Sequence, residues 1–117
     1  MTDRDETGKR ARGDNDYISY RRGQPADPAG PTGLMWLGGF KSDMTGTKAE
    51  ALSTWAEGAR RALLRFDYFA HGASSGDFRQ GTIGRWRDDA LAAFDELTEG
   101  PQVLVGSSMG GWIALLV

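Results

Sequence analysis

The stretch QVLVGSSMGGWIALLV, residues 102–117, decides the fold. Its first four residues are apolar enough to predict a buried strand, and the residues after the glycine pair at 110–111 predict a helix. Between them, residues 106–110 have the pattern G-x-S-x-G. This pattern predicts a sharp strand-to-helix turn that holds Ser108 in a strained backbone conformation, with its hydroxyl above the end of the sheet. Gly106 and Gly110 are the two glycines that leave room for such a turn.

The rest of the chain predicts an alternation of strands and helices. We expect strands at 17–22, 33–37, 64–68 and 102–105, and helices at 47–63, at 82–97 and from 112 onward. Residues 24–32 are rich in proline and predict a loop. The helix expected at 47–63 begins with a capping box, in which the Thr47 hydroxyl would accept a hydrogen bond from the Glu50 amide. This order predicts an α/β fold with a mostly parallel sheet and helices on both faces.

Residues 1–16 differ from the rest because they hold nine charged side chains and almost no apolar ones. Such a segment cannot offset its ordering entropy by burial, so we expect a disordered tail before a domain at 17–117. No apolar run follows these charges, as a signal peptide would need, and the acidic residues are unlike a transit peptide. We therefore expect a cytoplasmic protein.

Composition excludes several classes of function. The chain of 117 residues carries 14 Lys and Arg against 16 Asp and Glu, a net charge of −2, which argues against nucleic acid as a partner. The apolar runs are too short to span a bilayer. There is no cysteine, which excludes disulfides, cysteine metal sites and thiol nucleophiles. We expect no metal and no organic cofactor, because an activated serine needs neither for acyl transfer.

The chemistry that fits this turn is nucleophilic attack by Ser108 on an acyl group. The oxyanion that forms needs two backbone N–H donors. Met109, directly after the serine, would supply one donor. The Phe40 amide, which follows the Gly38-Gly39 pair at the end of a predicted strand, would supply the other.

The base and acid are harder to assign. His71 is the only histidine, but it precedes Ser108, whereas this architecture orders the residues serine, acid, histidine. We therefore interpret His71 as a solvated residue at the rim of the site. Asp67 and Asp43 are candidate carboxylates, and for Asp67 a turn-capping role is favoured.

Five segments, at 39–44, 46–49, 65–68, 84–89 and 100–112, together resemble the α/β-hydrolases. Within them the chain is similar to the type that includes mitochondrial palmitoyl-protein thioesterases and acyl-glucuronide hydrolases, with its bacterial relatives. The likeness covers residues 17–117. It implies a serine hydrolase of the carboxylesterase or thioesterase class, acting on small acyl esters or thioesters, with Ser108 as the nucleophile.

The resemblance also implies that the chain is the N-terminal half of the fold, with the catalytic acid, the histidine and the C-terminal strands downstream. We expect the chain alone to be inactive, with an exposed strand edge at 102–105 that allows self-association. Two alternatives stay open. The protein could be a non-catalytic binding module of the same fold, or a short protein that completes its sheet by forming a dimer.

Overall fold

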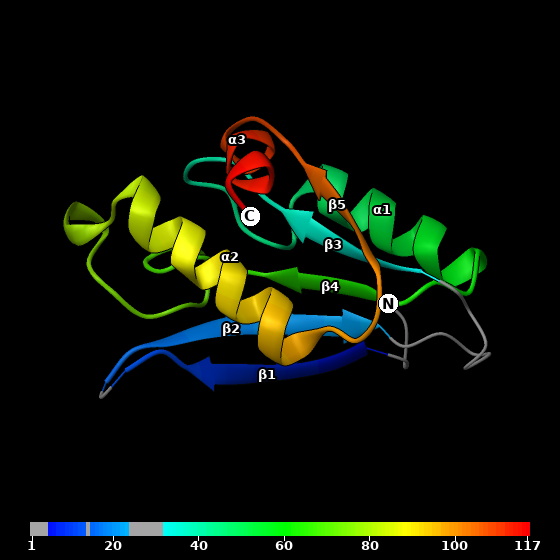
Figure 1. Ribbon diagram of the computed structural model, residues 1–117, viewed down its shortest axis with the longest axis horizontal. Coiled ribbons are helices and arrows are strands. Elements are labelled where there is room, and N and C mark those ends of the chain that lie inside the picture. The colour runs from blue at the N-terminus through cyan, green and yellow to red at the C-terminus, as the bar shows by residue number, and fades with distance from the viewer. Residues whose placement is uncertain (1–4, 14, 24–31) are drawn as a thin grey trace.

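The computed structural model describes residues 5–13, 15–23 and 32–117. Five strands form one sheet in the order β1-β2-β4-β3-β5, and three α-helices and one 3-10 helix pack around it (Figure 1). The strands are β1 (Asp5–Ala11), β2 (Tyr17–Gly23), β3 (Gly33–Leu37), β4 (Leu63–Phe66) and β5 (Gln102–Gly106). The helices are α1 (Thr47–Gly58), η1 (Phe78–Gln80), α2 (Ile83–Leu97) and α3 (Met109–Leu116).

The sheet is mixed. Strand β3 lies between β4 and β5 and is parallel to both, as the alternation of strands and helices predicts. Strands β1 and β2 run antiparallel, β1 against β2 and β2 against β4. The parallel character expected for most of the sheet therefore belongs to β4, β3 and β5, the half that carries the serine turn.

The expectation of a disordered tail over residues 1–16 is wrong for Asp5–Ala11, which form the edge strand β1. Pairing with β2 satisfies the backbone groups on one side of this segment, and its charged side chains stay in contact with water or with an opposite charge. Glu6 accepts from Arg22 on β2, and Asp5 accepts from the buried Arg65 on β4 at 3.1 Å. These ion pairs reach across the sheet and replace the apolar burial that the segment lacks.

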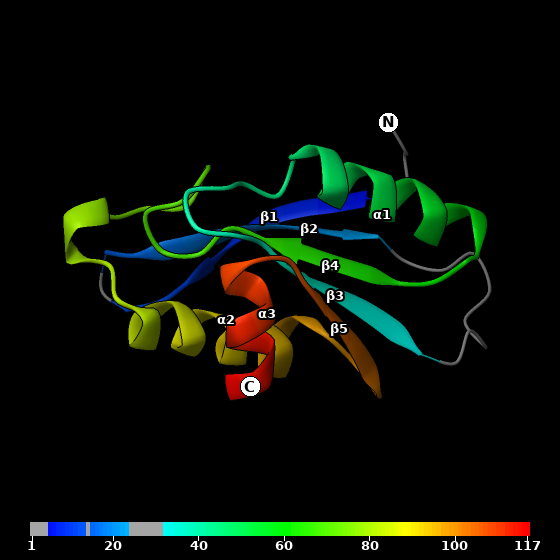
Figure 2. The same ribbon diagram turned by 90° about the horizontal axis from the view of Figure 1, so that it is seen from above.

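Helices cover both faces of the sheet, as predicted. Helix α1 lies on one face and helices α2 and α3 lie on the other (Figure 2). The larger core cluster lies beneath α2 and α3 and centres on Met35, Leu37 and Ile113, all fully buried. A smaller cluster, which includes Leu34 and Trp36 of β3, packs against α1. Strand β3 is therefore buried on both faces and fixes the middle of the sheet.

Helix α1 begins at Thr47, as predicted, but its N-terminal cap and its last residue differ from the prediction. It ends at Gly58, five residues early, and the predicted capping box is absent, because Gly46 is the N-cap and its carbonyl accepts the Glu50 amide. The Glu50 carboxylate instead accepts from Arg65 at 2.7 Å. A buried arginine thus outcompetes the local cap. The loop predicted at 24–32 lies almost entirely outside the described residues.

Strand β5 is an edge of the described sheet, as expected. Val103 on this strand is 48% exposed. Helix α3, which follows β5, also presents apolar side chains to solvent, among them Trp112 and Leu115. Helix α3 and the edge strand β5 are in contact with each other, on either side of the serine turn (Figure 1).

Candidate active site

Ser108 lies at the apex of the turn between β5 and α3, and its side chain is exposed. Its backbone angles, φ 57° and ψ −121°, lie in a region that residues other than glycine rarely adopt. The predicted strand and strained serine are thus present, and the helix begins at Met109, three residues earlier than the predicted start at residue 112. The strain holds the hydroxyl clear of the sheet and at the start of a helix, whose positive end favours developing negative charge.

Gly106 and Gly110 allow this turn because the chain passes too close to itself for a side chain. A Cβ on Gly106 would overlap the Gly110 carbonyl, and a Cβ on Gly110 would overlap the Leu37 carbonyl at the end of β3. The Ser107 amide donates to the same Leu37 carbonyl at 3.1 Å. The end of β3 therefore fixes the position of the serine turn.

The loop after β3 brings Phe40 to the serine. A Cβ on Gly39 would lie 3.5 Å from the Ser108 Cβ, so the two segments are in contact. Within the part of the chain that the structure describes, the Phe40 amide donates to no other group. Met109 begins α3, where the first N–H groups have no partner inside the helix. The fold thus brings the segments of both predicted oxyanion donors to Ser108.

A cavity of about 360 Å³ opens beside the serine, between the loop after β3 and the start of α1. The Lys48 ammonium at its wall lies 3.3 Å from the Ser107 hydroxyl. The cavity is lined by Trp36, Gly39, Phe40, Ser42, Asp43, Gly46, Thr47, Lys48, Ala49, Ser107 and Ser108. It is large enough for a small acyl or leaving group next to the nucleophile.

His71 is not the solvated rim residue that the sequence predicts. Its side chain is buried, and it is surrounded by the rings of Tyr68, Phe78 and Trp86 at centroid distances of 5.5, 5.4 and 5.1 Å. The prediction rested on the position of His71 ahead of Ser108 in the chain, and chain order does not report the aromatic side chains that close over the residue. Among the described residues, no side chain forms a hydrogen bond with the Ser108 hydroxyl, and both ring nitrogens of His71 contact backbone groups instead.

The two candidate aspartates cap loops. Asp67 accepts from the amides of Met44 and Ala73 at 2.8 and 3.0 Å, so it joins two loops and does not form the local Asx turn that the sequence predicts. Burial raises the pKa of the Asp67 carboxyl, and the two amide hydrogen bonds oppose this effect. Asp43 accepts from the hydroxyl and the amide of Thr45, which together lower its pKa.

Sequence reasoning missed Tyr68 as a part of this site. Its hydroxyl donates to the Gly38 carbonyl at 3.0 Å, in the loop that carries Phe40. Burial, with a smaller contribution from Asp89, raises the pKa of Tyr68, so the phenol stays a neutral donor. Its place at the end of an apolar strand, in the segment RFDYFAHG, is the signal that could have suggested such a role.

Neither a metal nor a membrane span is indicated by the described part of the chain. No group of three or more His, Asp or Glu side chains there is arranged to hold a metal ion. No helix within those residues combines the length and the hydropathy that crossing a bilayer requires.

Residues 22–117 match the model of the alpha/beta hydrolase family, which is most of the chain. The chain belongs to the α/β-hydrolase family. The chain is 41% identical over 103 residues to bovine mitochondrial palmitoyl-protein thioesterase ABHD10, covering 88% of this chain and 32% of the relative. The human ABHD10 thioesterase is 40% identical over 98 residues, covering 84% of this chain and 31% of the relative. The chain thus spans about a third of the length of these curated relatives.

Solved structures match the chain over nearly all of its length. Alpha/beta hydrolase domain-containing protein 10 from mouse superposes with a TM-score of 0.86 at 36% identity, covering 95% of this chain and 43% of the mouse chain. A putative hydrolase from Agrobacterium vitis superposes with a TM-score of 0.84 at 45% identity, covering 96% of this chain and 43% of the Agrobacterium chain. The fold described here therefore corresponds to a part of each of these hydrolase folds.

Proposed function

We propose that the protein is a serine hydrolase that cleaves acyl esters or thioesters through an acyl-enzyme on Ser108. The observation that carries the proposal is the strained, exposed serine at a strand-to-helix turn, next to the free Phe40 amide. Relatives named as palmitoyl-protein thioesterases support acyl thioesters as the substrate class.

In the proposed reaction the Ser108 Oγ attacks the acyl carbonyl carbon, and a base removes the serine proton. The carbonyl oxygen takes up the negative charge, and the amides of Phe40 and Met109 donate to it. The C–O or C–S bond to the leaving group then breaks, and the leaving group takes the proton. Water hydrolyses the resulting serine ester and regenerates the hydroxyl.

The base is the component that the described residues do not supply, because His71 is occupied by two backbone groups. We propose that the acid and the histidine lie in a part of the protein outside this chain. It follows that the 117-residue chain alone should not turn over substrate. An isolated serine hydroxyl is a weak nucleophile without an adjacent base.

The test is active-site labelling of the complete gene product with a fluorophosphonate probe, alongside hydrolysis of p-nitrophenyl esters and acyl thioesters of increasing chain length. We expect labelling and hydrolysis in the parent protein and neither in Ser108→Ala. A folded, complete parent that does not react with the probe would exclude the hydrolase and would favour the binding module of the same fold.

A further inference from the structure

His71 lies between two backbone groups that belong to different loops. Its Nε2 accepts from the Lys41 amide at 3.0 Å, and its Nδ1 lies 3.0 Å from the Phe69 carbonyl oxygen. The side chain is only 3% exposed. The imidazole therefore links the loop after β4 to the loop that carries Phe40.

These two partners determine which ring nitrogen donates and which accepts. A backbone amide can only donate, so Nε2 must present its lone pair to Lys41, and a carbonyl can only accept, so Nδ1 must carry the proton. The ring is thus the neutral Nδ1–H tautomer. A protonated imidazole would place two N–H groups opposite each other at Nε2 and Lys41.

The residue that His71 holds is a strained one. Lys41 has φ 61°, in the left-handed region, although it is not glycine. Such a conformation persists only where the surroundings fix it. The His71 hydrogen bond is the described contact that fixes the peptide plane between Phe40 and Lys41.

A second contact fixes the other side of the same segment. The Tyr68 hydroxyl donates to the Gly38 carbonyl, so Gly39 and Phe40 lie between two peptide planes that are both held from the loop after β4. The free amide of Phe40 lies in this two-residue interval. The orientation of this amide is therefore set by Tyr68 and His71 together.

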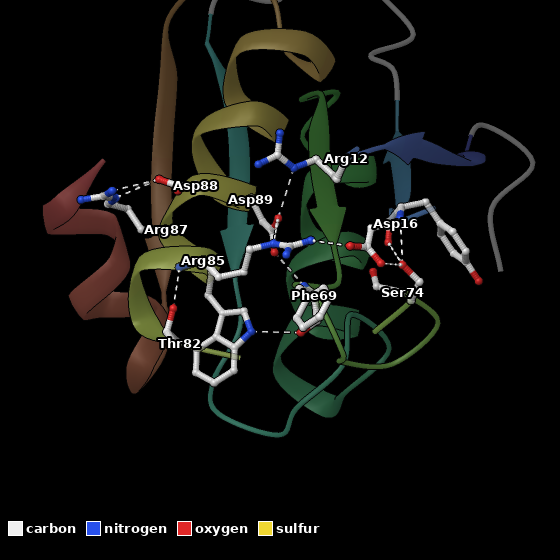
Figure 3. Close-up of polar contacts among 12 residues, drawn as sticks. Arg12, Asp16, Phe69, Ser74, Thr82, Arg85, Arg87, Asp88 and Asp89 are labelled. Carbon is white, nitrogen blue, oxygen red and sulfur yellow. Dashed lines mark hydrogen bonds and ion pairs between the residues drawn. The ribbon is translucent and has the colours of Figure 1, made fainter. Parts of the chain in front are cut away.

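His71 is itself rigidly supported. The Phe69 carbonyl also accepts from the Trp86 indole at 3.0 Å, and the Phe69 amide donates to the buried Asp89 at 2.7 Å (Figure 3). Helix α2 therefore anchors the carbonyl to which the ring donates. A ring supported in this way can transmit the position of α2 to the loop after β3.

From these contacts we infer that His71 is a positioning residue for oxyanion stabilisation, which orients the Phe40 amide by accepting a hydrogen bond from Lys41. The inference rests on the proposed hydrolase function. The alternative is that His71 contributes only ring packing to the core. The two explanations differ in whether the site depends on the Nε2 acceptor of His71 or on its aromatic ring.

Two variants of the complete protein separate the acceptor from the ring. His71→Phe keeps an aromatic ring and loses the acceptor, whereas His71→Gln loses the ring and keeps a neutral acceptor at a similar distance. We expect His71→Phe to lower kcat about 10- to 100-fold with little change in KM, since loss of a whole oxyanion donor costs about 10²- to 10³-fold. His71→Gln should recover most of the lost kcat. The opposite ranking, with Phe active and Gln impaired, would overturn the inference in favour of ring packing.

Amide hydrogen exchange at Lys41 gives a readout that does not need activity. Protection of this amide should be lost in His71→Phe and retained in His71→Gln. Unchanged protection in His71→Phe would overturn the inference whatever the kinetics show. If the parent protein neither reacts with fluorophosphonate nor hydrolyses esters, the hydrolase proposal fails. Loss of Lys41 protection in His71→Phe would in that case still support His71 as the residue that holds the loop.

Discussion

The carboxylate of Asp89 accepts a hydrogen bond from the Phe69 amide at 2.7 Å. Both groups are buried, and 20 residues separate them in the chain. Asp89 also pairs with Arg12 at 3.2 Å, so one side chain of α2 joins the loop after β4 to the residue that follows β1 (Figure 3). This single carboxylate connects the N-terminal hairpin to the segment that supports His71.

Asp89 should give the protein an unusual pH dependence. Burial raises its pKa from the ordinary value of 3.8, against the opposing effects of the Phe69 amide and two arginines. Between 3.8 and this raised pKa the folded state holds a proton that the unfolded state has lost, so the contribution of Asp89 to stability falls as pH rises. The free energy of unfolding of the parent minus that of Asp89→Asn should therefore decrease as pH increases through this window.

Asp43 provides a control of opposite sign. Its pKa is lowered, first by the Thr45 hydroxyl, so its contribution to stability is present above 3.8 and is lost as pH falls through the lowered pKa. The parent minus Asp43→Asn difference should increase with pH below 3.8. Urea unfolding at a series of pH values checks both slopes, and slopes of the same sign would contradict the assignment.

The close passage of Gly110 against β3 predicts a position-specific cost of a methyl group. Gly110→Ala should lower the free energy of unfolding by about 2–5 kcal/mol, because its Cβ meets the backbone carbonyl of Leu37 and the chain must shift. Gly58→Ala, at the end of α1, is the matched control, since nothing lies within 4 Å of its Cβ. That variant should be stabilised by up to about 1 kcal/mol. Equal melting temperatures for the two variants would contradict the prediction.

The backbone strain at Ser108 predicts that two inactive variants differ in stability. Ser108→Gly relieves the strained φ of 57°, whereas Ser108→Ala keeps it. The glycine variant should be more stable than the alanine variant by about 1–3 kcal/mol. Differential scanning calorimetry of the two proteins measures this, and a more stable alanine variant would show that the turn is not strained.

Arg65 should hold β1 on the sheet. Its guanidinium is buried and donates to the Met44 carbonyl, to Glu50 and to Asp5. Arg65→Met should cost about 1–3 kcal/mol, since it leaves a buried carbonyl and two carboxylates without their donor. Amide exchange in β1 should accelerate more than in β3. The exposed Arg79→Met is the control and should leave the melting temperature unchanged.

The open edge of β5 predicts self-association of the 117-residue chain. Val103 is half exposed on this edge, and a lysine there would place charge where a second strand would pair. Val103→Lys should shift the purified chain toward a monomer in sedimentation velocity. An identical distribution of species for the two chains would exclude pairing through this edge.

The sequence by itself determined the serine turn. A strand, a strained serine between two glycines and a helix are encoded within residues 102–117, because the apolar runs and the glycine spacing act over a few residues. The alternation of β3, α1, β4, α2 and β5 was readable for the same reason, as was the Phe40 loop, which follows a strand directly. In each case the information lies in neighbouring residues.

The burial of His71, the Glu50 contact and the strand β1 depend on the folded structure. Glu50 favours Arg65 over a local cap, and Asp5 finds the same arginine 60 residues away. His71 is buried by rings that come from three different segments. Polar and charged side chains take their roles from partners distant in the chain, and no local pattern specifies which partner the folded sheet brings within reach.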